Sequence, residues 1–196
     1  MTTLIVATGN PGKLKELQAY LSPLGWELQL KPKTLEIEET GSTFAENACL
    51  KASEIAQATG EWAIADDSGL EVRALQGRPG VYSARYGATD AERIERLLQE
   101  LEGQSDRSAR FVCSIALARS DGTIVLQAEG RCAGEILLRV QGTGGFGYDP
   151  IFYVPEQQKT FAEMTVAEKQ AISHRGQALE RLLPALQELS SRLSLD

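Results

Sequence analysis

The spacing of apolar residues along the chain predicts short buried strands and amphipathic helices. Residues 3–7 and 62–65 are short, largely apolar runs of the kind found in buried strands. After residue 13 and again after residue 89, apolar residues recur at helical spacing, as expected for helices with one buried face. Three capping-box sequences predict helix starts: Thr43-x-x-Glu46, Thr89-x-x-Glu92 and Thr165-x-x-Glu168.

The second half of the chain contains the alternation that is typical of strands. Apolar and polar residues alternate over 111–117, the pair Asp121-Gly122 turns the chain, and residues 124–128 return it. This pattern predicts a hairpin with a type I′ turn. A further strand is expected around residues 134–138, and a C-terminal leucine-rich helical segment is expected to be interrupted at Pro184.

Length and composition fit one globular domain with two lobes. The chain has 196 residues, of which 42% are hydrophobic, enough for a full core. The polar residues 104–108 are the expected crossing between lobes. We therefore expect one lobe formed by residues 1–103 and 165–196, and a hairpin-rich lobe formed by residues 104–164.

Charge and hydropathy exclude several classes of protein. A net charge of −7 argues against a nucleic-acid partner. No apolar run approaches the roughly 18 residues of a membrane span, and the N-terminus lacks a signal-peptide pattern, so we expect no membrane association and a cytoplasmic location. Cys49, Cys113 and Cys132 have no metal-binding or disulfide spacing and are expected to be buried free thiols.

Two adjacent acids follow the apolar run at residues 62–65. We expect this strand to end in Asp66-Asp67-Ser68-Gly69. Neighbouring residues of an extended chain point to opposite faces, so Asp66 and Asp67 should have different roles. One can hold a divalent cation or polarise a water while the other caps backbone N–H groups. The alternative is an ordinary Asx turn at the end of a strand.

The first predicted strand runs into a glycine turn, Thr8-Gly9-Asn10-Pro11-Gly12-Lys13, and then into a helix. Such a turn aims backbone N–H groups and the positive helix end at one point, which suits phosphate. It does not match a Walker loop, because Leu14 stands where that motif has a hydroxyl. The alternative is a sharp connection with a solvated lysine.

Acids in the loop before the second helix could complete a cation site with Asp67. Glu38 and Glu39 lie in this loop, and Mg²⁺ commonly takes one or two carboxylates together with water and substrate phosphates. These acids could equally be solvated. Lys51, on the helix that follows, is able to face a cleft.

A glycine-rich stretch, residues 141–150, carries Phe146 between glycines. A strand and not a helix is expected to follow, which excludes a dinucleotide-binding loop. The glycines would let a ligand approach the backbone while Phe146 stacks on a flat base. Alternatively, this stretch is a hairpin loop with Phe146 in the core. His174, the single histidine, is either a satisfied polar residue or, with Arg175, part of an anion or carbonyl site.

Taken together, seven motifs resemble the inosine/xanthosine triphosphate pyrophosphatase family across nearly the whole chain. They are Thr8-Gly-Asn-Pro-Gly-Lys13, Glu38-Glu-Thr-Gly41, Phe44-x-Glu-Asn47, Ala65-Asp-Asp-Ser-Gly69, Gly80-Val-Tyr-Ser-Ala-Arg85, Gly144-Gly-Phe-Gly-Tyr-Asp-Pro150 and Ser173-His-Arg175. The resemblance implies an elongated α/β fold, with a mixed β-sheet, flanking helices and two lobes around a substrate cleft, and a homodimer. It also implies Mg²⁺-dependent hydrolysis of inosine, deoxyinosine and xanthosine triphosphates to the monophosphate and pyrophosphate, which removes deaminated purines from the nucleotide pool.

The resemblance also assigns roles to individual residues. It implies metal ligation by Glu38 and Asp67, with Glu39 as a substitute for Glu38, and general-base catalysis by Asp67. The implied substrate contacts are Thr8, Gly9, Asn10, Pro11, Gly12 and Lys13 with Lys51 for the phosphates, Ser68, and Phe146, Gly147, Tyr148, Asp149, Lys169, His174 and Arg175 for the nucleoside.

Three other functions remain open on the sequence. A nucleotide-binding regulatory protein would have the same residues without turnover. A phosphatase that releases the γ-phosphate would give orthophosphate and a diphosphate. A pyrophosphatase for modified pyrimidines would differ in its choice of base.

Overall fold

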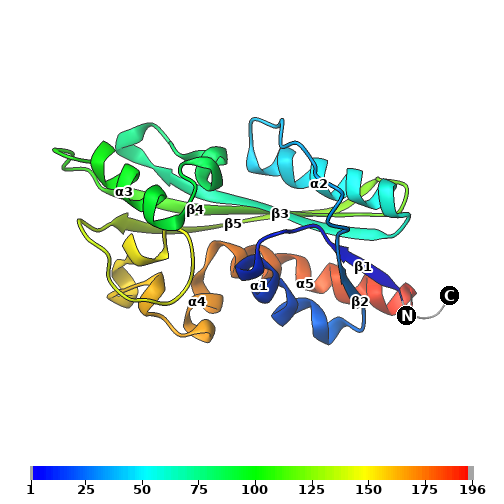
Figure 1. Ribbon diagram of the computed structural model, residues 1–196. Helices are drawn as coiled ribbons and strands as arrows, with labels where there is room; N and C mark the ends of the chain where they lie inside the picture. The colour runs from blue at the N-terminus through cyan, green and yellow to red at the C-terminus, as the bar shows by residue number, and fades with distance from the viewer. Residues whose placement is uncertain (1, 194–196) are drawn as a thin grey trace. The chain divides into compact units, whose positions relative to one another are not determined.

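The computed structural model describes residues 2–193, which form a seven-stranded mixed sheet with flanking helices (Figure 1). The strand order is β2-β1-β3-β4-β5-β6-β7. The strands are β1 (Thr3–Val6), β2 (Glu27–Leu30), β3 (Trp62–Val72), β4 (Ser108–Ala118), β5 (Ile124–Ile136), β6 (Phe152–Val154) and β7 (Lys159–Thr160). The helices are α1 (Pro11–Leu21), α2 (Phe44–Thr59), α3 (Asp90–Glu100), α4 (Val166–Ile172) and α5 (His174–Leu193). β1 is parallel to both of its neighbours, whereas β6 is antiparallel to β5 and β7, so the mixed α/β fold is confirmed.

The chain divides into two compact units, and the boundaries differ from those predicted. Unit 1 comprises residues 1–67, 113–130 and 175–196, and unit 2 comprises residues 68–112 and 131–174. The predicted crossing, at residues 104–108, lies inside unit 2. The chain instead changes unit within β3, β4 and β5, because each of these long strands contributes residues to both units.

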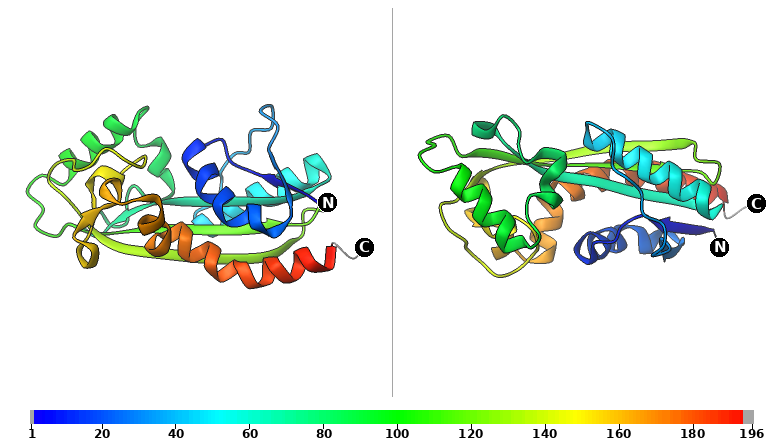
Figure 2. Two further views of the ribbon diagram at one scale, coloured as in Figure 1. Left: turned by 90° about the horizontal axis from the view of Figure 1, so that it is seen from below. Right: turned by 45° about the horizontal axis from the view of Figure 1, so that its top comes forward.

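Unit 1 has two cores, one on each face of its strands. α1 and α5 pack on one face, through Leu17, Leu179 and Leu182, against Leu4 and Ile64. α2 packs on the other face, opposite α1, as Figure 1 and the right view of Figure 2 show. This second core is rich in alanine: Ala7, Ala48, Ala52, Ala56, Ala63, Ala65, Ala116 and Ala118. Small side chains let the helix backbone approach the strands closely.

Unit 2 has a single core. It combines Leu70 and Val72 of β3 with Ile94 and Leu97 of α3 and a cluster of aromatic rings. The rings of Phe111, Phe152 and Phe161 lie within 4.6 to 5.7 Å of one another, centroid to centroid. Aromatic contacts of this kind add to the stabilisation that burial alone provides.

Three local predictions need correction. β3 does not end at Gly69 but continues to Val72, so Asp66 and Asp67 lie inside a strand and do not form an Asx turn. The hairpin turn is not type I′, because Gly122 has positive φ and Asp121 does not. A type I turn followed by a left-handed glycine fits instead. β5 extends through the strand expected near residue 134, and α5 continues through Pro184.

The helix starts agree with the predictions. Thr43 and Thr165 each cap a helix through a complete capping box, and Thr89 accepts a hydrogen bond from the Glu92 amide. These short-range signals need no tertiary partner, which is why sequence alone locates them. None of the helices within residues 2–193 is long and apolar enough to cross a membrane.

Candidate active site

Asp66 and Asp67 point to opposite faces of β3, as their adjacency predicts. Ala63 and Ala65, which share a face with Asp67, belong to the core beneath α2. Ile64, which shares a face with Asp66, belongs to the core formed with α1 and α5. Both carboxylates are buried, at 2% and 5% exposure, so each requires partners. The two sets of partners are different.

Asp67 is held by two residues of α2. The Lys51 ammonium lies 3.2 Å from Oδ1 of Asp67, and the Asn47 amide donates a 3.1 Å hydrogen bond to Oδ2. Asn47 and Lys51 are four residues apart and therefore lie on one helix face. Lys51 also contacts Glu39 at 2.7 Å, so that one ammonium joins carboxylates from two separate segments.

Burial determines the direction of the pKa shift at Asp67, whereas neighbouring acids determine it at Lys51. Desolvation raises the pKa of Asp67 above its ordinary value, although Lys51 opposes the shift. Burial by itself would lower the pKa of Lys51, but Asp67, Asp66 and Glu39 outweigh it and raise that pKa. Asp67 is thus a stronger base than an ordinary aspartate, beside a lysine that stays charged.

Asp66 forms a separate buried ionic network with α1 and α5. Its Oδ2 lies 3.0 Å from the Lys13 ammonium and accepts hydrogen bonds from Arg175 at 2.8 and 3.3 Å. Arg175 also pairs with Glu16. Although burial opposes ionisation, Lys13 and Arg175 hold the pKa of Asp66 far below its ordinary value. Among the described residues, none hydrogen-bonds to Oδ1 of Asp66.

The glycine turn directs fewer free N–H groups outward than expected. Asn10 caps α1, and its Oδ1 accepts hydrogen bonds from the amides of Gly12 at 2.8 Å and Lys13 at 3.2 Å. The Thr8 hydroxyl accepts one from the Asn10 amide, and the Thr8 amide itself bonds to a carbonyl. The predicted phosphate contacts of residues 8–13 would therefore come mainly from side chains, or would require the Asn10 cap to open.

The structure distinguishes between the two candidate acids in the loop before α2. Glu39 is half-buried and pairs with Lys51, which in turn contacts Asp67. Glu38, the first choice from sequence, is exposed. The geometry thus favours Glu39 as the acid associated with Asp67, while ligation by Glu38 stays a prediction.

The donor set around Asp67 suits a magnesium ion. No group of three or more His, Cys, Asp or Glu side chains within residues 2–193 could hold a metal ion. Asp67 and Glu39 nevertheless offer two carboxylates beside a single ammonium. Mg²⁺ is commonly bound through one or two carboxylates, with water and substrate phosphates completing its shell, so the residues fit this ion.

The predicted nucleoside-recognition residues lie in unit 2, apart from Arg175. Asp149 is 2% exposed, and its Oδ2 lies 2.7 Å from the Lys169 ammonium and accepts a hydrogen bond from the Phe146 amide at 2.9 Å. The same ammonium lies 4.7 Å from the centroid of the half-buried Phe146 ring. A cation over an aromatic face is attracted to it, so Lys169 helps to orient Phe146.

Two more predicted residues of unit 2 contact other residues of the same unit. The His174 ring is buried and stacks on Phe111, with centroids 4.7 Å apart and an interplanar angle of 10°. The Tyr148 hydroxyl donates a 2.9 Å hydrogen bond to the Ser83 carbonyl. Ser68, the first residue of unit 2, is half-buried in β3.

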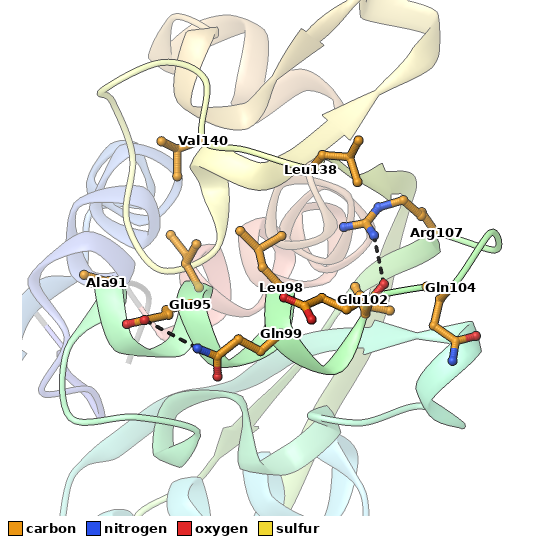
Figure 3. Close-up of a pocket in the computed structure, with 12 residues that line it drawn as sticks. Ala91, Glu95, Leu98, Gln99, Glu102, Gln104, Arg107, Leu138 and Val140 are labelled. Atoms are coloured by element: carbon orange, nitrogen blue, oxygen red, sulfur yellow. Dashed lines mark hydrogen bonds between the residues drawn. The ribbon is translucent and has the colours of Figure 1, made fainter.

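A pocket of about 740 Å³ in unit 2 lies away from all of these residues (Figure 3). α3 forms much of its lining, with Leu98 and Glu95, and the exposed side chains of Leu138 and Val140 stand across from the helix. The predicted site residues are not among its lining. Its size would admit a small ligand, and its lining combines apolar side chains with Glu95, Glu102 and Arg107.

Sequence reasoning gave no individual role to Asn47, Asp66 or Glu16. For Asn47 a signal existed, because a residue four positions before Lys51 shares its helix face. The partners of Asp66 come from α1 and α5, which are more than 50 and 100 residues away in sequence. Local spacing contains no signal for such contacts.

Comparison with known proteins agrees with the resemblance seen in the motifs. Residues 4–185 match the model of the Ham1 family. A protein of Nostoc sp. named dITP/XTP pyrophosphatase is 66% identical over 96% of both chains, and one of Synechocystis sp. with the same name is 63% identical over 93% of this chain and 94% of its own.

Solved structures show the same fold. A HAM1 protein from Coxiella burnetii has a TM-score of 0.85 and 49% identity, over 96% of this chain and all of that one. The Ham1 protein of Staphylococcus aureus has a TM-score of 0.86 and 40% identity, over 95% and 99% of the two chains. With the sequence match extending over most of its length, the chain belongs to the Ham1 family.

Proposed function

We propose that this protein hydrolyses deaminated purine nucleoside triphosphates, namely inosine, deoxyinosine and xanthosine triphosphate, to the monophosphate and pyrophosphate. The observation that carries the proposal is the buried Asp67, whose pKa is raised by burial, beside Lys51 and Glu39. Relatives named dITP/XTP pyrophosphatase, at 50–66% identity, support the choice of substrate. The biological role would be to keep deaminated purines out of DNA and RNA.

The residues around Asp67 can divide the chemical work. Asp67 would accept a proton from the water that attacks the α-phosphorus, because a raised pKa makes it a better base near neutral pH. Lys51 and Lys13 would stabilise the negative charge of the triphosphate. Pyrophosphate leaves with the electron pair of the broken P–O bond, and the monophosphate keeps the oxygen of the attacking water.

Magnesium is part of the proposal. Glu39 and Asp67 would hold it, with Glu38 as the alternative to Glu39, and it would supply neutralising charge to the phosphates. Tight coordination makes a carboxylate less basic. We therefore assign the base role to Asp67 and the cation mainly to Glu39, substrate oxygens and water.

Base choice is proposed for the unit 2 residues. A 6-keto oxygen would accept hydrogen bonds from cationic or backbone donors near Phe146, Lys169 and His174, with the Phe146 ring stacking on the base. The 6-amino group of adenine would leave such donors unpaired, and an unpaired buried donor discriminates strongly. Arg175 is the exception among the predicted nucleoside contacts, because its guanidinium binds Asp66 and Glu16.

Product analysis tests the proposal. The protein is incubated with Mg²⁺ and a panel of triphosphates of inosine, xanthosine, adenosine, guanosine and modified pyrimidines, and pyrophosphate and orthophosphate are measured separately. Pyrophosphate from the inosine and xanthosine compounds is expected, and Asp67→Asn should abolish it while the circular dichroism spectrum is retained. Orthophosphate would indicate a γ-phosphatase, and binding without product would indicate a regulatory protein.

We also propose a homodimer in the cytoplasm, where the free nucleotide pool is found. Sedimentation equilibrium should give about twice the mass of one chain. A monomer at micromolar concentration would contradict the proposed assembly without affecting the proposed reaction.

A further inference from the structure

The glycine-rich segment that carries Phe146 is held by a residue outside the seven motifs that carry the family resemblance. Asp90, the first residue of α3, accepts a 2.7 Å hydrogen bond from the Gly147 amide through Oδ2. Its other carboxylate oxygen binds Arg93 at 2.6 Å. Asp90 and Gly147 are 57 residues apart in sequence, so this contact connects α3 to a distant segment.

The Phe146 backbone is thereby fixed on both sides of its Cα atom. The Phe146 amide bonds to Asp149, and the next amide, that of Gly147, bonds to Asp90. Gly147 has a φ of +62°, a left-handed conformation in which few other residues are comfortable. A carboxylate that accepts from a backbone N–H makes a charge-assisted hydrogen bond, which is stronger than a neutral one.

The two carboxylates differ in what they anchor. Asp149 belongs to the segment itself and connects it to Lys169, whereas Asp90 connects it to the start of α3. Arg93, one turn further along α3, pairs with Asp90 and also donates to the Gly87 carbonyl, which limits the movement of the Asp90 side chain.

We infer that Asp90 is a positioning residue for nucleotide recognition: by binding the Gly147 amide it holds Phe146 in the orientation needed to stack on the base. The inference rests on the proposed function for its substrate, but not for the contact itself. Asp90 touches neither the phosphates nor the reacting atoms in this scheme, so its loss should affect KM more than kcat.

Kinetics of matched variants test the inference. Asp90→Ala should raise the KM for inosine triphosphate about tenfold, the effect of one lost charge-assisted hydrogen bond, with a smaller change in kcat. Glu92→Gln is the control, because Glu92 is also an acid in the first turn of α3 but accepts from Ala88. Arg93→Ala removes the ion pair that restrains Asp90 but leaves the Gly147 contact, so its KM should rise less than that of Asp90→Ala. The Glu92→Gln control should keep KM within about twofold.

Hydrogen exchange tests the contact without any enzymatic activity. A peptide covering residues 143–149 should exchange faster in Asp90→Ala than in the wild type, and at the wild-type rate in Glu92→Gln. If Asp90→Ala does not fold, Asp90→Asn retains the shape and weakens the acceptor, and the same results are expected. If the wild type hydrolyses none of the triphosphates, the proposed function fails while exchange still tests the contact. The inference would be overturned if exchange of this peptide were unchanged in the Asp90 variants. It would also be overturned if Glu92→Gln raised KM as much as Asp90→Ala does.

Discussion

At the scale of single residues, two chemically identical side chains acquire different properties from their surroundings. Asp66 lies between Lys13 and Arg175, and its pKa is strongly lowered. Asp67 faces α2, and desolvation raises its pKa. The first is a permanently charged structural anion, and the second is a base that can exchange protons. Sequence reasoning anticipated two roles from the alternation of the strand, but took the strand to end here.

Neutralising Asp66 should destabilise the protein strongly. Asp66→Asn leaves Lys13 and Arg175 without their shared negative partner in a buried site, and losing one partner of a buried ion pair costs about 3 kcal/mol or more. Urea unfolding followed by tryptophan fluorescence measures this loss. As a control, Glu188→Gln removes the exposed partner of Arg192 and should leave the midpoint unchanged. Equal midpoints for wild type and Asp66→Asn would contradict the structural role.

The buried thiols give a prediction about pH. Burial raises the pKa of Cys113 to about 12 and that of Cys132 to about 11. Because the thiolate is the reactive form, both should stay protonated and resist a thiol reagent at pH 8, while the half-buried Cys49 reacts first. Raising the pH towards 11 should increase labelling of Cys132 before that of Cys113. Mass spectrometry of labelled peptides at several pH values provides the measurement, and rapid labelling of Cys113 at pH 8 would refute the prediction.

At the scale of elements, the two faces of β3 are matched to different helices. The sheet face beneath α2 is rich in alanine, whereas the opposite face of the sheet is rich in leucine and isoleucine, so α2 can lie close enough for Asn47 and Lys51 to reach Asp67. The packing of this helix therefore supports the proposed chemistry.

Enlarging one of these alanines should show how tightly α2 packs. Ala52 is fully buried, and Ala52→Leu adds three carbons to a filled core, at a cost of about 1–3 kcal/mol. Ala58→Leu, on the exposed face of the same helix, should change stability by less than about 0.5 kcal/mol. Thermal unfolding of both variants measures the difference. Equal stabilities of the two variants would mean that the interface between α2 and the sheet is not tightly packed.

The elements also show what the sequence can predict. The presence of the strands, the helix caps and the buried helix faces follows from local patterns and agrees with the structure, whereas the extent of some elements does not. β3 extends beyond the prediction because its acids are compensated by Lys13, Lys51 and Arg175 from distant segments. α5 continues through Pro184 because Leu182 and Leu186 are buried in the unit 1 core, which offsets the lost backbone hydrogen bond. Local patterns likewise cannot predict the contact between Asp90 and Gly147, because the two residues are brought together only by the tertiary structure.

At the scale of the whole molecule, an acidic protein carries localised positive charge. The net charge is −7, yet Lys13, Lys51 and Arg175 belong to two buried ionic networks in unit 1. These positive groups are paired with acids in the interior and do not form a basic surface. The negative net charge of the protein would repel a polymer with many phosphates.

Duplex DNA should accordingly fail to bind. Non-specific association with DNA depends on neutralising many phosphates with surface lysines and arginines, which a net charge of −7 opposes. An electrophoretic mobility assay at 50 mM salt, with the protein at micromolar concentration, should show no shift. A salt-dependent shift would mean that a basic surface exists despite the overall charge.

The alternation of Asp66 and Asp67 along β3 constrains how this protein can change over time. Inserting or deleting one residue within the strand ahead of them would exchange their faces, turning Asp66 towards α2 and Asp67 towards α1 and α5. This one-residue change of register would disrupt both ionic networks at once, because every side chain that follows it moves to the opposite face. Length variation among natural or engineered versions of this chain should therefore concentrate in its loops and spare the eleven residues of this strand.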